Sequence, residues 1–192
     1  MILFAELCRP MIAMQAKDNK FISMNTIYPD IEQESPLWDE FPDAEAIAER
    51  ALQIAGQKLS DQFRDGVELS ILLSDDDHIR SVNQEWRGID KPTNVLSFPA
   101  VDVNKISKAP FLGDIIIAYE TVKREAESES KAFADHFTHL VIHGFLHLLG
   151  YDHIEESDAE KMESLEVDLL AELNIPDPYQ DRSSPNFGGD RE

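Results

Sequence analysis

The sequence predicts a single α+β domain built on one mixed β-sheet with flanking helices. Short apolar runs bounded by turn residues alternate with longer segments in which apolar residues recur at helical spacing. The chain has 192 residues, a length typical of one domain, and its hydrophobic fraction of 42% is compatible with a buried core. No internal repeat is present in the sequence. We therefore expect one core and one sheet, with three or four strands distributed among the helices.

The first elements are a short strand and a helix. Residues 25–28 have the composition of a strand, which Pro29 is expected to end. The acidic stretch 31–41, which contains Trp38, shows no regular period. A helix is predicted from Pro42-Asp43 to about residue 60, because four apolar residues recur at helical spacing: Ile47, Ala51, Ile54 and Ala55.

A strand and a helix follow. Residues 67–73 alternate apolar and polar side chains, which is typical of a strand. Residues 74–77 (Ser-Asp-Asp-Asp) favour a helix start, since acidic side chains interact well with the positive end of the helix dipole. Gly88 is expected to end this helix. Its buried stripe is predicted to consist of three residues: Ile79, Val82 and Trp86.

The remaining part of the domain is predicted to hold two strands and three helices. Residues 93–98 form a strand that we place at a sheet edge, because Pro99 lacks the N–H of a ladder hydrogen bond. The apolar run 115–118 is the second strand. The helices are expected at residues 120–127, 131–149 and 157–173.

Both ends of the chain are expected to lie outside the folded domain, which we place at residues 24–175. Several methionines offer alternative starts, so residues 1–23 are interpreted as a disordered leader or an over-long start. Residues 176–192 are rich in Pro, Gly, Ser and charged residues and are interpreted as a disordered acidic tail.

Charge and cysteine content restrict the compartment and the partners. The net charge of −21 argues against DNA or other nucleic acid bound through a broad basic surface. Residues 79–131 hold equal numbers of basic and acidic residues, so a polyanion could still be admitted there, and the rest of the chain carries the net negative charge. The single cysteine, Cys8, fits a reducing cytoplasm, and no apolar run is long enough to span a membrane. We therefore expect a cytoplasmic protein without a membrane partner.

Three histidines form the most informative pattern in the chain. His143 and His147 are four residues apart, so their imidazoles point the same way from a helix. Gly150 can adopt a positive φ and turn the chain out of the helix, which brings His153 back toward them. Three neutral imidazoles suit zinc, which with three protein ligands keeps one coordination position open. The pattern predicts one catalytic zinc ion per chain.

The spacing of these histidines is that of the metzincin proteases, H-x-x-x-H-x-x-G-x-x-H. Those enzymes carry a glutamate, the general base, directly after the first histidine. The residue at this place is Gly144. The metal site is therefore metzincin-like, but peptide hydrolysis by the metzincin route is not expected.

Arg87 is a candidate for binding phosphate, and Lys91 lies four residues further on. A guanidinium offers fork-shaped donors to phosphate oxygens and can stabilise charge that develops on phosphorus. From spacing alone, an Arg87 that only bonds the last carbonyls of its own helix is an equally good interpretation. Asn94 and Ser97 are further polar candidates, for contacts to a substrate or for the fold.

Other histidines lie near the motif or elsewhere in the chain. His139 is one turn before His143 and is interpreted as structural, with a contact to a metal ligand or to substrate as the alternative. His136 and His78 are predicted to be surface residues.

Three separated motifs resemble the YbeY family of bacterial endoribonucleases and ribosomal RNA maturation factors. They are HGFLHLLGYDH at 143–153, WRG and KPTNVLSF within 86–98, and LGDI at 112–115. The resemblance covers about residues 24–173, and no residue within the motifs departs from it.

The resemblance implies a four-stranded mixed sheet and zinc held by His143, His147 and His153. It implies a single-strand-specific endoribonuclease that acts in maturation of the three-prime end of small-subunit ribosomal RNA and in ribosome quality control. Arg87 and His143 match positions that the family treats as functionally critical. RNA would be the substrate, and ribosomal proteins or a ribosome-associated GTPase the partners.

Two other functions stay open on the sequence alone. One is a ribosome-assembly factor whose zinc is structural and which acts by binding; replacement of His147 would then weaken folding and binding together, with no cleavage to lose. The other is a metal hydrolase that acts on a small molecule or peptide, which Gly144 makes less favourable.

Overall fold

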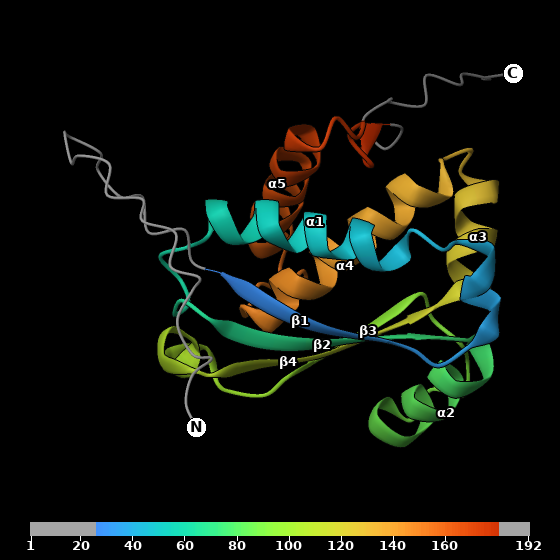
Figure 1. Cartoon of the computed structure of the whole chain (residues 1–192), viewed down its shortest axis with the longest axis horizontal. Coiled ribbons are helices and arrows are strands. Elements are labelled where there is room, and N and C mark those ends of the chain that lie inside the picture. Colours follow the sequence, from blue (N-terminus) through green and yellow to red (C-terminus); the bar gives the residue numbers. More distant parts are fainter. Residues whose placement is uncertain (1–25, 181–192) are drawn as a thin grey trace, which may run out of the picture.

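A four-stranded mixed sheet lies at the centre of the structure, a computed structural model that describes residues 26–180 (Figure 1). The strand order is β1-β2-β4-β3, with β1, β2 and β4 parallel and β3 antiparallel to β4 at one edge. The strands are β1 (Ile27–Gln33), β2 (Val67–Ser74), β3 (Val95–Pro99) and β4 (Phe111–Ala118). The predicted fold class and the edge position of the strand before Pro99 are confirmed. The leader predicted for residues 1–23 lies outside the described residues, as do residues 181–192 of the predicted tail.

Helices lie on both sides of this sheet. In Figure 1, α1 (Ala44–Lys58), α4 (Phe133–Leu148) and α5 (Glu156–Glu172) lie above the strands, and α3 (Tyr119–Ser128) lies beside α4. The remaining helix, α2 (Asp76–Arg87), lies below the strands and packs against β3 and β4. Two short 3₁₀ helices complete the described chain, η1 (Pro36–Glu40) and η2 (Val103–Lys108).

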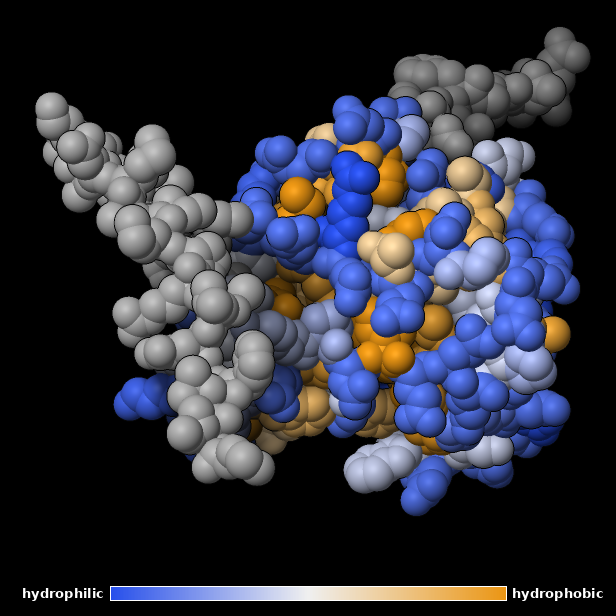
Figure 2. All heavy atoms as spheres, viewed as in Figure 1, coloured by the Kyte–Doolittle hydropathy of each residue, from blue (hydrophilic) through white to orange (hydrophobic). Residues whose placement is uncertain are grey.

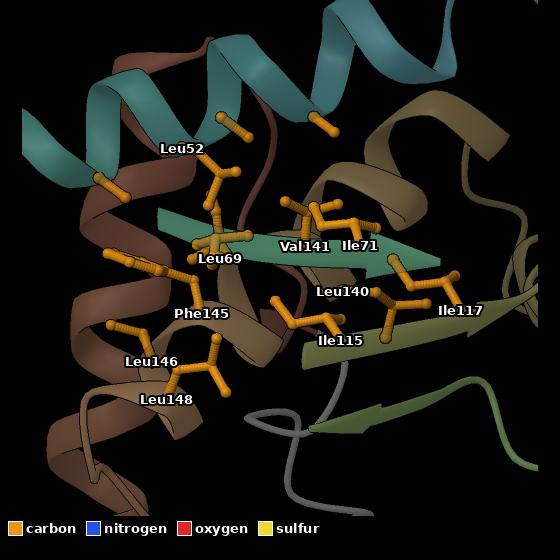
Figure 3. Close-up of a cluster of buried hydrophobic side chains, with 14 of the residues drawn as sticks. Leu52, Leu69, Ile71, Ile115, Ile117, Leu140, Val141, Phe145, Leu146 and Leu148 are labelled. Atoms are coloured by element: carbon orange, nitrogen blue, oxygen red, sulfur yellow. The ribbon is translucent and has the colours of Figure 1, made fainter. Parts of the chain in front are cut away.

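The main core lies between the sheet and α4. Alternate residues of β2 and β4 point toward the helices and meet apolar side chains of α4 and α1 (Figure 3). The fully or almost fully buried side chains at this contact are Leu52, Leu69, Ile71, Ile115, Ile117, Leu140, Val141 and Phe145. Burial of each large aliphatic or aromatic side chain contributes about 1.5–3 kcal/mol. Residues of α4 on the side away from the sheet are therefore the ones available for a site.

The stretch 31–41, predicted to be irregular, is ordered by two features. β1 continues through Pro29 to Gln33, because an edge strand can hold a proline whose missing N–H is not needed for pairing. Trp38 lies within η1, is fully buried, and donates its Nε1–H to the carbonyl oxygen of Ser74 at 2.8 Å. The prediction that Pro29 ends the strand is therefore wrong.

The stripe predicted for α2 is only partly correct. Ile79 is fully buried between α2 and the sheet, but Trp86 is 70% exposed. Trp86 lies in the last turn of α2 and packs against Phe98 of β3, with ring centroids 5.7 Å apart. The ends of the helix agree with prediction, since the Asp75 side chain accepts from the backbone N–H of His78 and Gly88 has a φ of 71°.

The sheet face below the strands carries an acidic and aromatic groove of about 730 Å³. Asp30, Asp114 and Phe98 lie in one row across the strands, and Glu32 and Trp86 also line the groove. The three carboxylates are exposed, and none forms an ion pair within residues 26–180. We call this surface, lined by these five residues, the acidic groove.

Hydrophilic residues cover most of the face shown in Figure 2, and hydrophobic residues are visible mainly in the recesses between them. This agrees with the acidic composition of the chain. None of the helices in the described part of the chain is long and apolar enough to cross a membrane.

Replacement of Gly144 by alanine should destabilise the protein. A Cβ at this position would lie 3.0 Å from Ile115 Cγ2 and 3.1 Å from Ser97 Oγ, so these side chains or the helix would have to shift by a few tenths of an ångström. We expect Gly144→Ala to lower the free energy of unfolding by about 1–3 kcal/mol in urea titrations. Ser130→Gly is the contrasting variant, because Ser130 has a φ of 54° and glycine adopts this conformation without strain. An unchanged stability of Gly144→Ala would show that the contact between α4 and the sheet is loose.

Candidate metal centre

The end of α4 and the turn that follows it bring the three predicted histidines together. His143 and His147 lie on the same side of α4, and His153 follows five residues after the helix ends. Gly150 has a φ of +85°, and a Cβ there would lie 2.4 Å from Val103 Cγ2, so the turn requires glycine for conformation and for space. Each histidine offers one nitrogen, and the three nitrogens lie within 4.8 Å of one another.

Hydrogen bonds define which nitrogens are available to a metal. His143 Nδ1 lies 2.6 Å from Glu166 Oε1, and His147 Nδ1 lies 2.9 Å from the carbonyl oxygen of Tyr151. Both partners only accept, so each Nδ1 carries the proton and each Nε2 carries a lone pair. The two Nε2 atoms are 3.1 Å apart. Tetrahedral zinc with bonds of about 2.0–2.1 Å separates its ligand nitrogens by about 3.3 Å, so the residues fit such an ion.

The protonation state of His147 also suits a metal ligand. Burial and, secondly, the neighbouring His143 lower the pKa of His147 to about 4. The imidazole is therefore neutral at pH 7, and the neutral form is the one that binds a metal.

Glu166, on α5, is a residue of the centre that the sequence analysis did not include. Burial raises the pKa of this fully buried side chain, but hydrogen bonds with His139 and His143 outweigh burial and lower the pKa to about 2. Glu166 is thus a buried carboxylate that orients the candidate ligand His143 through its Nδ1, the nitrogen on the side of the ring away from the metal position. The sequence does hold a signal, because Glu166 lies between Met162 and Leu169 on the apolar stripe of α5.

A cavity of about 620 Å³ is lined by two of the three histidines, His143 and His153. His139 and His143 form part of its wall, as does Asn94, whose side chain donates to Glu125 Oε2 at 2.9 Å. His136 also lines it and is only 6% exposed, so the prediction of a surface residue is wrong. Its Nε2 lies 2.9 Å from the same oxygen of Glu125, and this pairing between α4 and α3 explains the burial.

Arg87 and Lys91 lie at the exposed start of the loop that leads to Asn94. Neither side chain makes an ion pair or hydrogen bond within the described part of the chain. The backbone of the loop is held, since Asn83 Nδ2 donates to the carbonyl oxygen of Lys91 at 2.8 Å. Both cations are therefore free to meet a ligand, but neither is among the residues that line the cavity.

Other polar residues near the centre have structural contacts. Ser97 is packed beneath Gly144, and Asp114 lies on the opposite side of the sheet in the acidic groove. The Asp152 side chain accepts from the backbone N–H of His153 at 2.7 Å and so helps to fix the third histidine. The side of α4 on which metzincins carry their base faces the sheet here, so position 144 could not supply a base to the centre.

An α+β domain with three converging imidazoles that could hold a metal ion, and without a glutamate beside the first of them, differs from the peptide-cleaving metzincins. The chain belongs to the YbeY family. The family profile, described as Endoribonuclease YbeY, matches residues 31–174.

Curated relatives agree with this assignment. Endoribonuclease YbeY of Bradyrhizobium diazoefficiens is 52% identical over 149 residues, which cover 76% of this chain and 81% of that protein. Endoribonuclease YbeY of a Rhodopseudomonas palustris strain is 48% identical over 174 residues, which cover 87% of this chain and 91% of that protein. The relative of Sinorhizobium fredii, with the same name, is 57% identical over 119 residues, or 62% of this chain and 69% of that protein.

Zinc should stabilise the wild-type protein but not His147→Ala. A ligand that binds only the folded state contributes about 2.7 kcal/mol at 100 times its Kd, which raises the Tm of a domain of this size by roughly 5–10 °C. We expect this shift in calorimetry of the wild type and its loss in His147→Ala. His78→Ala is the control, because His78 lies on α2, where it contacts Glu34 and Ser74. Equal shifts in all three proteins would place the zinc elsewhere.

Proposed function

We propose that this protein is a zinc-dependent endoribonuclease that cleaves single-stranded RNA by phosphodiester hydrolysis. Membership of the YbeY family carries the proposal, and the convergence of His143, His147 and His153 supports it. A zinc ion held there would act as a Lewis acid and would lower the pKa of water, so that hydroxide could be available as a nucleophile near neutral pH. Zinc is favoured among divalent metals because the site offers three imidazole nitrogens within 4.8 Å of one another, two of them 3.1 Å apart.

The chain's own residues divide the remaining tasks. Glu166 and the Tyr151 carbonyl fix the two helical imidazoles, so that their Nε2 lone pairs converge. The adjoining cavity is large enough to admit part of an RNA strand. Arg87 binds a phosphate of the substrate, since its guanidinium is exposed and has no competing carboxylate among residues 26–180. Lys91 adds a second positive charge on the same loop.

The proposed substrate is small-subunit ribosomal RNA near its three-prime end, in ribosome maturation and quality control in the cytoplasm. A net charge of −21 repels free RNA, so a basic partner that presents the strand would favour the correct substrate. The acidic groove offers Asp30, Glu32 and Asp114 to such a partner, beside the exposed ring of Trp86. We propose that a basic ribosomal protein or a ribosome-associated GTPase binds there.

Arg87→Glu should abolish RNA cleavage while the protein stays folded and zinc-loaded. Loss of a phosphate contact that stabilises developing charge lowers kcat/KM by about 100-fold or more. The assay uses labelled RNA that spans the end of the small-subunit ribosomal RNA. Arg50→Glu on α1 is the control, because it makes the same charge change at another exposed site.

Cleavage by the wild type and by Arg50→Glu, but not by Arg87→Glu, supports the proposed role of Arg87. Equal cleavage by all three proteins would remove Arg87 from the site. Absence of cleavage by the zinc-loaded wild type, with intact binding to the small subunit, would favour the assembly factor that acts by binding alone.

Reversal of charge in the acidic groove should weaken binding to the small ribosomal subunit. The double variant Asp30→Lys/Asp114→Lys replaces attraction of a basic partner by repulsion, and we expect the association rate to fall at least tenfold at low salt. Surface plasmon resonance with purified subunits gives this rate. Glu45→Lys/Glu49→Lys changes the charge equally on α1 and should bind more tightly than the groove variant. Identical binding of the two variants would contradict the proposal.

A further inference from the structure

We propose that Tyr179 is a positioning residue of the metal centre, which acts on the ligand His143 through Glu166. The inference rests on the proposed metal site, and it assigns to the segment after α5, residues 174–180, a role in positioning a metal ligand. Residues 176–180 of this segment belong to the region that the sequence predicts to be a tail.

The segment turns back toward α4 and is held at several points. Asn174 has a φ of 60°, and the following Ile175 N–H donates to the Leu170 carbonyl oxygen at 3.0 Å, which reverses the chain. Lys131 Nζ donates to the carbonyl oxygen of Pro178 at 3.2 Å. These contacts place Tyr179 beside α4.

The Tyr179 hydroxyl points to the carboxylate behind the centre. It donates to Glu166 Oε2 and lies 3.2 Å from His139 Nε2, which is itself 3.1 Å from the same carboxylate oxygen. The Tyr179 ring stands edge-on to His139, with centroids 5.6 Å apart. The other carboxylate oxygen of Glu166 accepts from His143 Nδ1 at 2.6 Å. A continuous chain of contacts therefore runs from Tyr179 through Glu166 to the candidate ligand.

Glu166 requires these hydrogen bonds because it is buried. Its side chain has no solvent exposure, so each carboxylate oxygen depends on protein donors. His143 engages one oxygen, while His139 and Tyr179 share the other. Loss of the hydroxyl leaves the carboxylate free to rotate toward His139, and the orientation of His143 then loosens. A purely packing role for Tyr179 would need only its ring.

The test measures zinc affinity by competition with a chromogenic chelator, together with the visible spectrum of the cobalt-substituted protein. Outer residues that orient metal ligands change affinity by about 10–100-fold. We expect Tyr179→Phe to raise the Kd for zinc about tenfold and to shift the cobalt spectrum, and Glu166→Gln to have a larger effect. Tyr28→Phe is the matched control, because Tyr28 is 59% exposed on β1.

An unchanged zinc Kd and cobalt spectrum in Tyr179→Phe would overturn the proposal. Glu166→Gln alters a buried group, so its folding is checked by circular dichroism without metal; if it unfolds, Tyr179→Phe alone decides, since it keeps the ring. Neither readout involves RNA. A wild type that binds zinc but cleaves no RNA would therefore contradict the proposed function and leave this inference intact.

Discussion

The tight contact between α4 and the sheet determines where the metal centre can form. Gly144 approaches Ile115 and Ser97 so closely that a hydrogen atom is the largest substituent that fits without movement. One side of the helix therefore packs on the sheet, and the helical period turns His143 toward Glu166 on α5, with His147 on the same side of α4 as His143. The close packing that excludes a glutamate side chain at position 144 thus also leaves the two imidazoles on the side of α4 that faces away from the sheet.

A polar layer sits between α4 and its neighbouring helices, and its hydrogen bonds offset the unfavourable burial of charge. Glu166 on α5 is fully buried yet keeps its negative charge, because imidazole and phenol donors surround it. Glu125 on α3 has a similar arrangement with His136 and Asn94, and these hydrogen bonds lower its pKa despite the opposing effect of burial. The histidine-rich face of α4 therefore connects three helices as well as holding the candidate ligands.

Local pattern was sufficient to predict much of the fold and the convergence of the three histidines, because both depend on short spacings. The interval from His143 to His147 and the glycine turn before His153 specify convergence without reference to the rest of the chain. Contacts that depend on tertiary packing could not be predicted from local spacing. Glu166 contacts His143 from α5, far along the sequence, and Trp86 in the last turn of α2 is exposed although it lies at helical spacing from the buried Ile79.

The chain's two tryptophans lie in opposite surroundings, and this gives the protein two separate optical reporters. Trp38 is fully buried and hydrogen-bonded to the carbonyl oxygen of Ser74, so its fluorescence is shielded from aqueous quenchers and follows the integrity of the core. Trp86 is 70% exposed and adjacent in sequence to Arg87, so its emission is open to iodide or acrylamide. Unfolding and occupancy of the loop after α2 can therefore be followed in one unlabelled sample, without an introduced dye.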